Sequence, residues 1–172
     1  YDVRDILIDK RGVWHLHGRV VDPARALSQI DVVLNGLHGG IGEDGTVGRV
    51  LEHSGIPYAG SRPLASALSL NKIRAREILQ RAGIEMPRAV TFSTSNDLNT
   101  EEMARFVFTE FGPPYILKPA NEGASFGIEL VYTIIDLQEA LGDMLDAYGS
   151  CLVEEYLIGE DATVGVIEDF RG

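Results

Sequence analysis

A lysine at the end of one apolar run, followed by a short glycine loop, is the part of the chain best suited to chemistry. The run has the composition of a β-strand and ends at Lys118. Gly123 and Gly127 allow positive φ, and the small side chains of Ala124 and Ser125 leave backbone N–H groups accessible. An ammonium group beside such N–H groups can bind phosphate oxygens, so the stretch suggests a phosphate-binding loop.

The same stretch is also consistent with an ordinary β-hairpin. In that interpretation the glycines only make the turn, which is their commonest use, and Lys118 is a solvated charge at a sheet edge. A Walker A loop is excluded, because the lysine precedes the glycines and no Gly-Lys-Ser or Gly-Lys-Thr tripeptide occurs. The residues by themselves leave the first two interpretations open.

A second group of candidate residues lies between His38 and Gly45, directly after the apolar run 31–35. That run is typical of a buried parallel strand, and ligands bind beyond the carboxyl ends of strands in open α/β sheets. By themselves, Glu43, Asp44 and Gly45 are most simply interpreted as a helix N-terminus, where acidic residues are stabilising. A carboxylate at such a loop end can both cap a helix and bind a ligand, so the two roles are compatible.

Turn residues and hydrophobic spacing predict the elements that position these groups. In the first half we expect strands over 3–8, 13–17, 31–35 and 56–59, a short amphipathic piece from Pro23, and helices over 46–52, from Ser61 to Lys72 and on to Arg81. Ser61 is the expected N-cap of the middle helix. In the second half we expect strands over 88–92, 114–132 as a hairpin, 151–156 and 163–167, with helices over 101–110 and 136–145.

The order of these elements predicts two domains. Strand and helix alternate up to about residue 84, which favours an α/β unit over residues 1–84. A hairpin with helices follows, which favours an α+β lobe with an antiparallel sheet over residues 85–172. In that sheet Lys118 lies on one strand, and Glu154 and Glu155 lie near the end of another.

Composition excludes several classes of protein. The 172 residues are 45% apolar and 24% charged, as in ordinary globular proteins, and the net charge of −11 argues against a nucleic-acid partner. Cys151, the single cysteine, lies in an apolar run, so we expect a buried, unreactive thiol. No apolar run is long enough for a membrane span and no signal peptide is visible, which predicts a cytoplasmic protein. His15 and His17 alternate along a strand without a third ligand nearby, so we expect no metal site there.

Four groups of residues then carry a resemblance. They are His38-Gly39-Gly40-Ile41-Gly42-Glu43-Asp44-Gly45; Gly60-Ser61 with 65–68 and Lys72; Lys118-Pro119 with 122–127; and 153–159. In this order and spacing they resemble the D-alanine–D-alanine ligase family of the ATP-grasp superfamily, over nearly the whole chain. The first group is specific, and the others are strong only together. The resemblance implies a partial Rossmann-like pre-ATP-grasp domain followed by the first lobe of an ATP-grasp domain.

The resemblance also implies roles for individual residues. Lys72 and Lys118 match the lysines that contact the phosphates of ATP, and Ser125 is implied as the catalytic hydroxyl of the loop. His38 and Glu43 match the site of the first D-alanine, with Glu43 on its amino group. The remaining nucleotide-binding residues implied are Glu122, Gly123, Ala124 and Phe126 in the loop, Glu154, Glu155, Tyr156 and Leu157 in the strand beside adenine, and Asp161 at the ribose.

The reaction that the family carries out is ATP-dependent joining of two D-alanines for peptidoglycan synthesis. A carboxylate attacks the γ-phosphate to form an acylphosphate, and the amine of the second D-alanine displaces phosphate. Both ends of the chain look cut, so we expect the Mg²⁺ ligands and the second D-alanine pocket beyond residue 172, and the chain alone to be inactive. Family members are commonly dimers, which makes a homodimer an expectation here.

Three departures from the family pattern leave alternatives open. Ala124 stands where a serine is common, Gly48-Arg49 replaces a glutamine and a small residue, and Asn71 replaces an aspartate before Lys72. The first alternative is another ATP-grasp carboxylate–amine ligase or a D-alanine–D-lactate ligase, which would share nearly all these residues. The second is a nucleotide-binding module without turnover.

Overall fold

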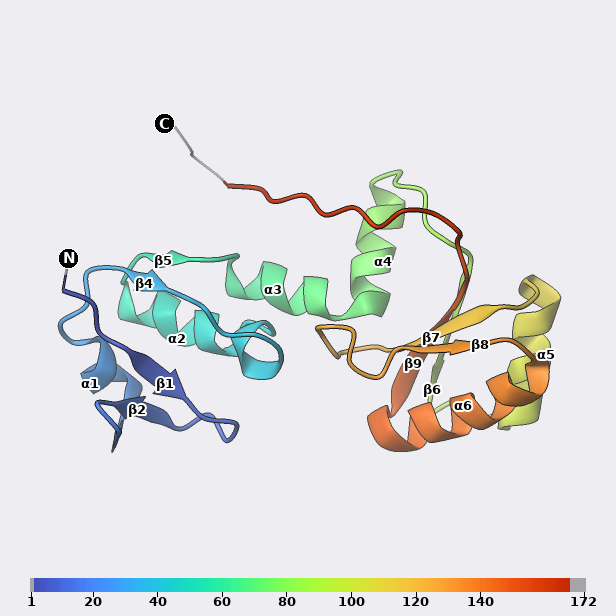
Figure 1. Ribbon diagram of the computed structural model, residues 1–172, viewed down its shortest axis with the longest axis horizontal. Helices are drawn as coiled ribbons and strands as arrows, with labels where there is room; N and C mark the ends of the chain where they lie inside the picture. The colour runs from blue at the N-terminus through green and yellow to red at the C-terminus, as the bar shows by residue number, and fades with distance from the viewer. Residues whose placement is uncertain (1, 168–172) are drawn as a thin grey trace.

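The structure is a computed structural model that describes residues 2–167. Two parts, each with its own sheet structure, are joined by the helices α3 (Pro63–Leu70) and α4 (Lys72–Arg81), as Figure 1 shows. No helix among the described residues is both long and apolar enough to cross a membrane.

The N-terminal part contains two small sheets. Strands β1 (Ile6–Ile8), β2 (Trp14–Leu16) and β3 (Arg19–Val21) form an antiparallel sheet, whereas β4 (Val33–Leu34) and β5 (Tyr58–Ala59) pair in parallel. The helices are α1 (Pro23–Leu27) and α2 (Thr46–Ser54), with a 3₁₀ turn, η1 (Gly40–Gly42), before α2. The core of this part is small, and its buried residues are Trp14, Ala26, Leu27, Val47 and Leu51.

Three expectations for this part need correction. The strand β3 was not predicted, and it forms because His17 and Gly18 take positive φ and turn the chain tightly after β2. The run 31–35 does pair in parallel, but Leu34 is 85% exposed, so the run is not buried. Ser61 does not cap α3: the N-cap is Arg62, without a side-chain bond, and Pro63 follows at the first helical position, where a missing N–H costs little.

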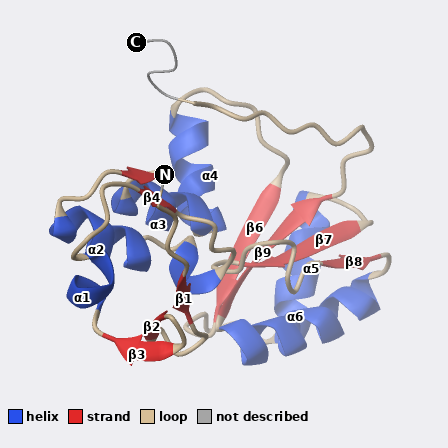
Figure 2. Cartoon of the chain, turned by 60° about the vertical axis from the view of Figure 1, so that its left-hand side comes forward, coloured by secondary structure: helices blue, strands red, loops and turns tan. Residues whose placement is uncertain are grey.

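The C-terminal part is a four-stranded antiparallel sheet in the order β6-β9-β7-β8. Its strands are β6 (Ala89–Ser93), β7 (Tyr115–Pro119), β8 (Glu129–Val131) and β9 (Ser150–Glu155). Helices α5 (Thr100–Glu110) and α6 (Ile134–Tyr148) lie together beside this sheet, as Figure 2 shows. The expected hairpin over 114–132 is confirmed, since β7 and β8 pair with Tyr115 opposite Val131.

The two faces of this sheet differ in chemistry. Side chains alternate along a strand, and Tyr115, Leu117 and Val153 enter the hydrophobic core with residues of α5 and α6. The neighbours in sequence lie on the opposite face, which therefore carries Lys118 of β7 and Glu154 of β9. Lys118 and Glu154 thus follow core residues directly in sequence but lie on the face of the sheet opposite the core.

Of two further predictions for this part, the burial of Cys151 is confirmed and the strand over 163–167 is not. Cys151 is fully buried in β9, as expected, and burial raises the pKa of its thiol to about 11, which disfavours the reactive thiolate. Residues 163–167 form no strand, and the prediction was wrong. Their alternation is typical of a strand, but all five are exposed and no described strand pairs with them.

Candidate functional site

The start of α4 is bound to the end of β7 by several hydrogen bonds. The backbone N–H of Lys72 donates to the carbonyl oxygen of Ala120 at 2.8 Å. The Nζ of Lys72 donates to the carbonyl oxygens of Pro119, at 3.0 Å, and of Glu122. These bonds join segments about 50 positions apart in the sequence, and they hold one predicted phosphate-binding lysine at the base of the glycine loop.

Asn71 reinforces this junction. Its side chain accepts from the N–H of Arg74 and so caps α4, while its amide nitrogen donates to Oδ1 of Asn121 at 2.6 Å. An aspartate at position 71 could cap the helix but could not donate to Asn121. The asparagine that departs from the family pattern therefore has a structural role in this chain.

The second predicted lysine, Lys118, is half-buried and lies beside two buried charged residues, Arg76 and Glu154. Its Nζ donates to Oε2 of Glu154, and the guanidinium of Arg76 lies 3.2 Å from Oε1 of the same carboxylate. Burial and the charge of Lys118 both lower the pKa of Lys72. Excess positive charge at this point favours an anionic ligand.

The loop after β7 reaches the junction of α3 and α4, where Figure 1 draws it between the two parts. Ala124 and Ser125 both take positive φ, at 50° and 60°, so the loop follows a tight path without glycine at these two positions. The side chain of Phe126 is exposed. A Cβ atom on Gly123 would lie 2.9 Å from Oε2 of Glu43, so the loop backbone approaches this carboxylate directly.

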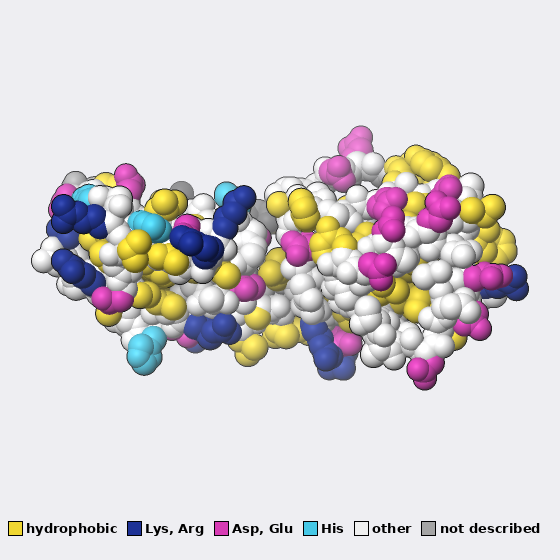
Figure 3. Space-filling view, turned by 90° about the horizontal axis from the view of Figure 1, so that it is seen from below, with side chains coloured by type: hydrophobic (Ala, Val, Ile, Leu, Met, Phe, Trp, Pro, Cys, Tyr) yellow, Lys and Arg dark blue, Asp and Glu magenta, His cyan; other side chains and the backbone are white. Residues whose placement is uncertain are grey.

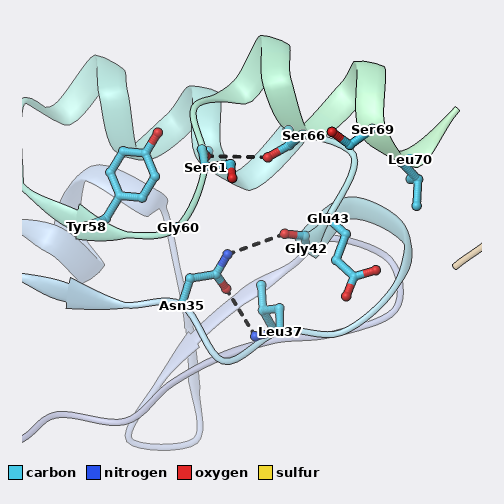
Figure 4. A pocket seen from close by; sticks show the side chains of 12 residues that line it. Asn35, Leu37, Gly42, Glu43, Tyr58, Gly60, Ser61, Ser66, Ser69 and Leu70 are labelled. Carbon is cyan, nitrogen blue, oxygen red and sulfur yellow. Dashed lines mark hydrogen bonds between the residues drawn. The ribbon is translucent and has the colours of Figure 1, made fainter. Parts of the chain in front are cut away.

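Glu43 lines a cavity of about 380 Å³ in the N-terminal part. The cavity lies beyond the carboxyl ends of the parallel strands β4 and β5, where open α/β sheets bind ligands. Figure 4 shows Glu43 and Leu70 at the same end of the cavity. Asn35 anchors the loop by accepting from the N–H of Leu37 and donating to the carbonyl of Gly42. Glu43 supplies the carboxylate of this cavity, and its other polar side chains are Asn35, Tyr58, Ser61, Ser66 and Ser69.

His38 and Asp44 lie beside Glu43 and differ in what they bind. The Nδ1 of His38 lies 3.7 Å from Oε1 of Glu43, and this imidazole is almost fully exposed. Asp44 accepts from the N–H of Thr46 at 2.7 Å just before α2, whose N-cap is Gly45 without a side-chain bond, so Asp44 fixes the turn that leads into the helix. Glu43, in contrast, lines the cavity, as expected of a ligand-binding carboxylate.

The segment predicted to lie beside adenine is the end of β9 and the residues after it. The N–H groups of Glu155 and Tyr156 donate to carbonyl oxygens of Arg88 and Pro114. Adenine contacts at these two residues would therefore use carbonyl oxygens. The side chain of Glu155 accepts from the backbone and guanidinium of Arg88, and these bonds, the backbone one most strongly, lower its pKa.

The structure brings some of the sequence-predicted residues together and leaves others apart. Lys72, Lys118, Glu154 and the loop 122–127 surround one point between α4 and β7, and Gly123 links that point to Glu43. Leu157 and Asp161 lie on the exposed chain after β9. Among residues 2–167, no group of three or more histidine, cysteine, aspartate or glutamate side chains could hold a metal ion.

Arg76 belongs to the charged group but was missed from the sequence. It is 9% exposed, and its second Nη donates to the carbonyl oxygen of Pro87. Its signal in the sequence was its position four residues after Lys72, which places both on one face of a helix. Arginine on a helix is usually solvated, so this signal was weak.

Comparison with known proteins gives matches along most of the chain. The family described as "D-ala D-ala ligase N-terminus" matches residues 4–61, and "D-ala D-ala ligase C-terminus" matches residues 78–171. A D-alanine–D-alanine ligase of Aquifex aeolicus is 38% identical over 138 residues, covering 80% of this chain and 45% of the relative. One of Xanthomonas axonopodis pv. citri is 38% identical over 150 residues, covering 85% of this chain and 46% of the relative.

Solved structures give the same result. The D-alanine–D-alanine ligase of Bacillus anthracis complexed with ATP has a TM-score of 0.67 and 33% identity, covering 78% of this chain and 43% of that one. The VanG D-Ala:D-Ser ligase of Enterococcus faecalis has a TM-score of 0.68 and 31% identity, covering 91% of this chain and 43% of that one. The chain thus spans less than half the length of these relatives.

Proposed function

Since this chain belongs to the D-alanine–D-alanine ligase family and has the α/β fold of its ATP-grasp members, we propose that its protein joins two D-alanines at the expense of ATP. The product would be the dipeptide used in peptidoglycan synthesis. One observation carries the proposal: the loop that begins beside the half-buried lysines Lys72 and Lys118 lies with Gly123 against the Glu43 carboxylate of the cavity. A nucleotide site and an amino-acid site would meet at this point.

The mechanism assigns electrostatic and positioning roles to the described residues. Glu43 binds the ammonium group of the first D-alanine, with His38 beside it. The carboxylate of that D-alanine attacks the γ-phosphate of ATP, giving an acylphosphate and ADP. The amine of the second D-alanine then displaces phosphate and forms the amide. Lys72 and Lys118 neutralise phosphate charge, and the loop 122–127 excludes water that would hydrolyse the acylphosphate.

The other predicted roles remain part of this proposal. Ser125 would orient the reacting groups, because Ala124 supplies no hydroxyl in the loop. The carbonyl oxygens near Tyr156 and the N–H of Leu157 would contact adenine, and Asp161 would accept from the ribose hydroxyls. In relatives a Mg²⁺ ion is expected with ATP, but the described residues fit the phosphates and not the metal, so we derive no step through it.

Three broader predictions belong to the same proposal. A domain boundary near residue 84 is supported by the sheets, since no strand before it pairs with a strand after it among the described residues. A cytoplasmic location and a homodimer are supported by the family resemblance.

A different acceptor is the first alternative. The VanG D-Ala:D-Ser ligase is structurally similar to this chain over 91% of its length, so the residues described here are compatible with acceptors other than D-alanine. We propose D-alanine first because the curated relatives cited above are D-alanine–D-alanine ligases. A nucleotide-binding module without turnover is the second alternative, and Ala124 is the residue that favours it.

The test is ADP release from the protein at its natural length, with and without D-alanine, D-serine or D-lactate. We expect D-alanine to stimulate ADP release and the dipeptide to form. Lys118→Met and Glu43→Gln should each reduce this rate at least about tenfold, whereas Arg105→Gln, on the surface of α5, should not change it. If the protein binds ATP but none of the three acceptors stimulates ADP release, the ligase proposal is wrong and the nucleotide-binding module without turnover is supported.

A further inference from the structure

Arg76 is a buried arginine to which the proposed reaction assigns no role. It lies on α4, one turn after Lys72, and only 9% of its surface is exposed. Its Nη1 lies 3.2 Å from Oε1 of Glu154, and its Nη2 donates to the carbonyl oxygen of Pro87. A planar guanidinium with an oxygen partner on each of two nitrogens has a fixed orientation.

Its partner Glu154 is just as buried, at 6% exposed, and divides its two oxygens between two cations. Oε1 faces Arg76, and Oε2 accepts from Lys118. Across β7 and β9, Ile116 is directly opposite Glu154, so Lys118 lies diagonally on the same face, within reach of a long side chain. The orientation of the Glu154 carboxylate therefore determines where the Lys118 ammonium lies.

The balance of charge explains why Arg76 would influence Lys118. Without Arg76, both oxygens of a buried carboxylate would be available to Lys118, and ion pairs are hard to separate where the dielectric constant is low. With Arg76 present, one oxygen is occupied. The ammonium group has three N–H donors, so Lys118 can keep its bond to Glu154 and still donate to a ligand.

We propose that Arg76 is a positioning residue for nucleotide binding, which fixes Glu154 so that Lys118 keeps donors free for a phosphate. Arg76 acts through Glu154 and not by contact with the nucleotide. The inference rests on the proposed function, since the phosphate is taken to be that of ATP.

The test compares ATP affinity among variants of the protein at its natural length, measured by calorimetry, with thermal unfolding measured without nucleotide. Arg76→Met should weaken ATP binding about tenfold, and Arg76→Lys, which keeps the charge but not the two-sided geometry, a few-fold. The matched control is Arg74→Met on the exposed face of the same helix, where Arg74 pairs with Glu77; it should bind ATP like the wild type.

A double-mutant cycle separates positioning from plain structural support. A purely structural role through Pro87 would not depend on the charge of Glu154. If Arg76 acts through Glu154, then in a Glu154→Gln background Arg76→Met should change ATP affinity by less than about twofold. An equal effect of Arg76→Met in both backgrounds would overturn the inference.

The outcomes also separate this inference from the proposed function. If the wild type binds ATP and both Arg76 variants bind it equally well, the inference is wrong and the proposed function stands. If the wild type binds no ATP, both fail. If Arg76→Met does not fold, Arg76→Lys takes its place in the cycle: weaker binding that depends on Glu154 supports the inference, and wild-type affinity overturns it.

Discussion

The hydroxyl group of Tyr115 is an unusual polar atom in the hydrophobic core of the C-terminal part. Tyr115 is fully buried on β7, its hydroxyl has no hydrogen-bond partner among the described residues, and burial raises its pKa. Removing an unpaired buried hydroxyl relieves a desolvation penalty, so Tyr115→Phe should raise the free energy of unfolding by about 1 kcal/mol. Denaturant unfolding measures this. The exposed Tyr132→Phe is the control, and a Tyr115→Phe variant less stable than wild type would reveal a partner.

The lowered pKa of Asp9 makes the stability of the N-terminal part depend on pH. Its carboxylate accepts from the N–H groups of Val13 and Arg11, and these bonds, that of Val13 most strongly, lower its pKa from 3.8 to about 2. A lowered folded-state pKa gives stability that is complete above the unfolded pKa and is lost as pH falls through the folded one.

Melting temperature should therefore fall between pH 4 and pH 2, the range set by the two pKa values of Asp9. Asp9→Asn should melt lower than wild type at pH 7 and come closer to it at pH 2, because the protonated aspartate has lost the same charge. Thermal unfolding followed by circular dichroism measures both. Asp5→Asn, at an exposed position, is the control, and a constant difference between Asp9→Asn and wild type over this range would contradict the assignment.

The beginning of α4 shows how one residue can serve two elements. Asn71 caps the helix and also donates to Asn121 at the start of the glycine loop. Asn71→Ala loses both bonds and should lower the free energy of unfolding by about 1 kcal/mol or more, while Asn121→Ala loses only the second and should cost less. Denaturant unfolding compares them; equal losses would mean that the cap contributes little.

The end of the glycine loop depends on Gly127. This residue has φ of +69°, and a Cβ atom there would lie 2.8 Å from the hydroxyl of Tyr148 and 3.0 Å from Cγ of Pro119. Strain and crowding together should make Gly127→Ala less stable by about 1–2 kcal/mol. Gly112→Ala, where nothing lies within 4 Å of the new Cβ, is the matched control. Similar stability of both variants would show that the loop adjusts without cost.

Across the elements, prediction from the sequence succeeded where hydrophobic spacing was sustained. The helices predicted over 101–110 and 136–145 exist as α5 and α6, because their apolar faces cover one side of a sheet. The strand predicted over 163–167 does not form, since alternation specifies two faces but not a pairing partner. The three-residue strand β3 was missed, because a segment so short gives almost no periodic signal.

In the candidate site, the sequence located residues but not their contacts. Lys118 was identified from the apolar run and glycine loop around it, and Lys72 by resemblance to a family. The bonds of Lys72 to Pro119 and Glu122 depend on packing between distant segments. Arg76 was not among the residues that carried the resemblance. The burial of an arginine on a helix can be recognised only when the sheet that packs against the helix is known. The group of Arg76, Glu154 and Lys118 could therefore be found only from the structure.

Over the whole molecule, charge is unevenly distributed. Residues 1–84 contain 11 Lys and Arg against 9 Asp and Glu, whereas residues 85–172 contain 4 against 17. Figure 3 shows the same contrast on one face, with basic and acidic side chains mixed over the N-terminal part and mostly acidic ones over the C-terminal part. An anion approaching the acidic half is repelled except near Lys72, Arg76 and Lys118, so phosphate binding there has to be local.

The two parts should also differ in local stability. Among the described residues, the core of the C-terminal part contains fifteen buried residues, drawn from four strands, two helices and Phe111 just after α5, whereas that of the N-terminal part contains five. The paired strands β4 and β5 are two residues long each, and Leu34 of β4 is exposed. Local opening needs less energy where little apolar surface is buried, so the N-terminal part should open more often than the C-terminal part.

Hydrogen exchange followed by mass spectrometry tests this difference on the chain of 172 residues. Leu117 of β7 and Val153 of β9 are fully buried. The amides of these two strands should exchange at least about tenfold more slowly than those of β4 and β5, since the exchange rate reports the free energy of local opening. In the protein at its natural length, the loop 122–127 should exchange fast without ATP and more slowly with it, because the proposed function closes this loop over the nucleotide. Equal protection of both sheets would mean that the chain opens as a single cooperative unit, with α3 and α4 coupling the two parts despite their unequal cores.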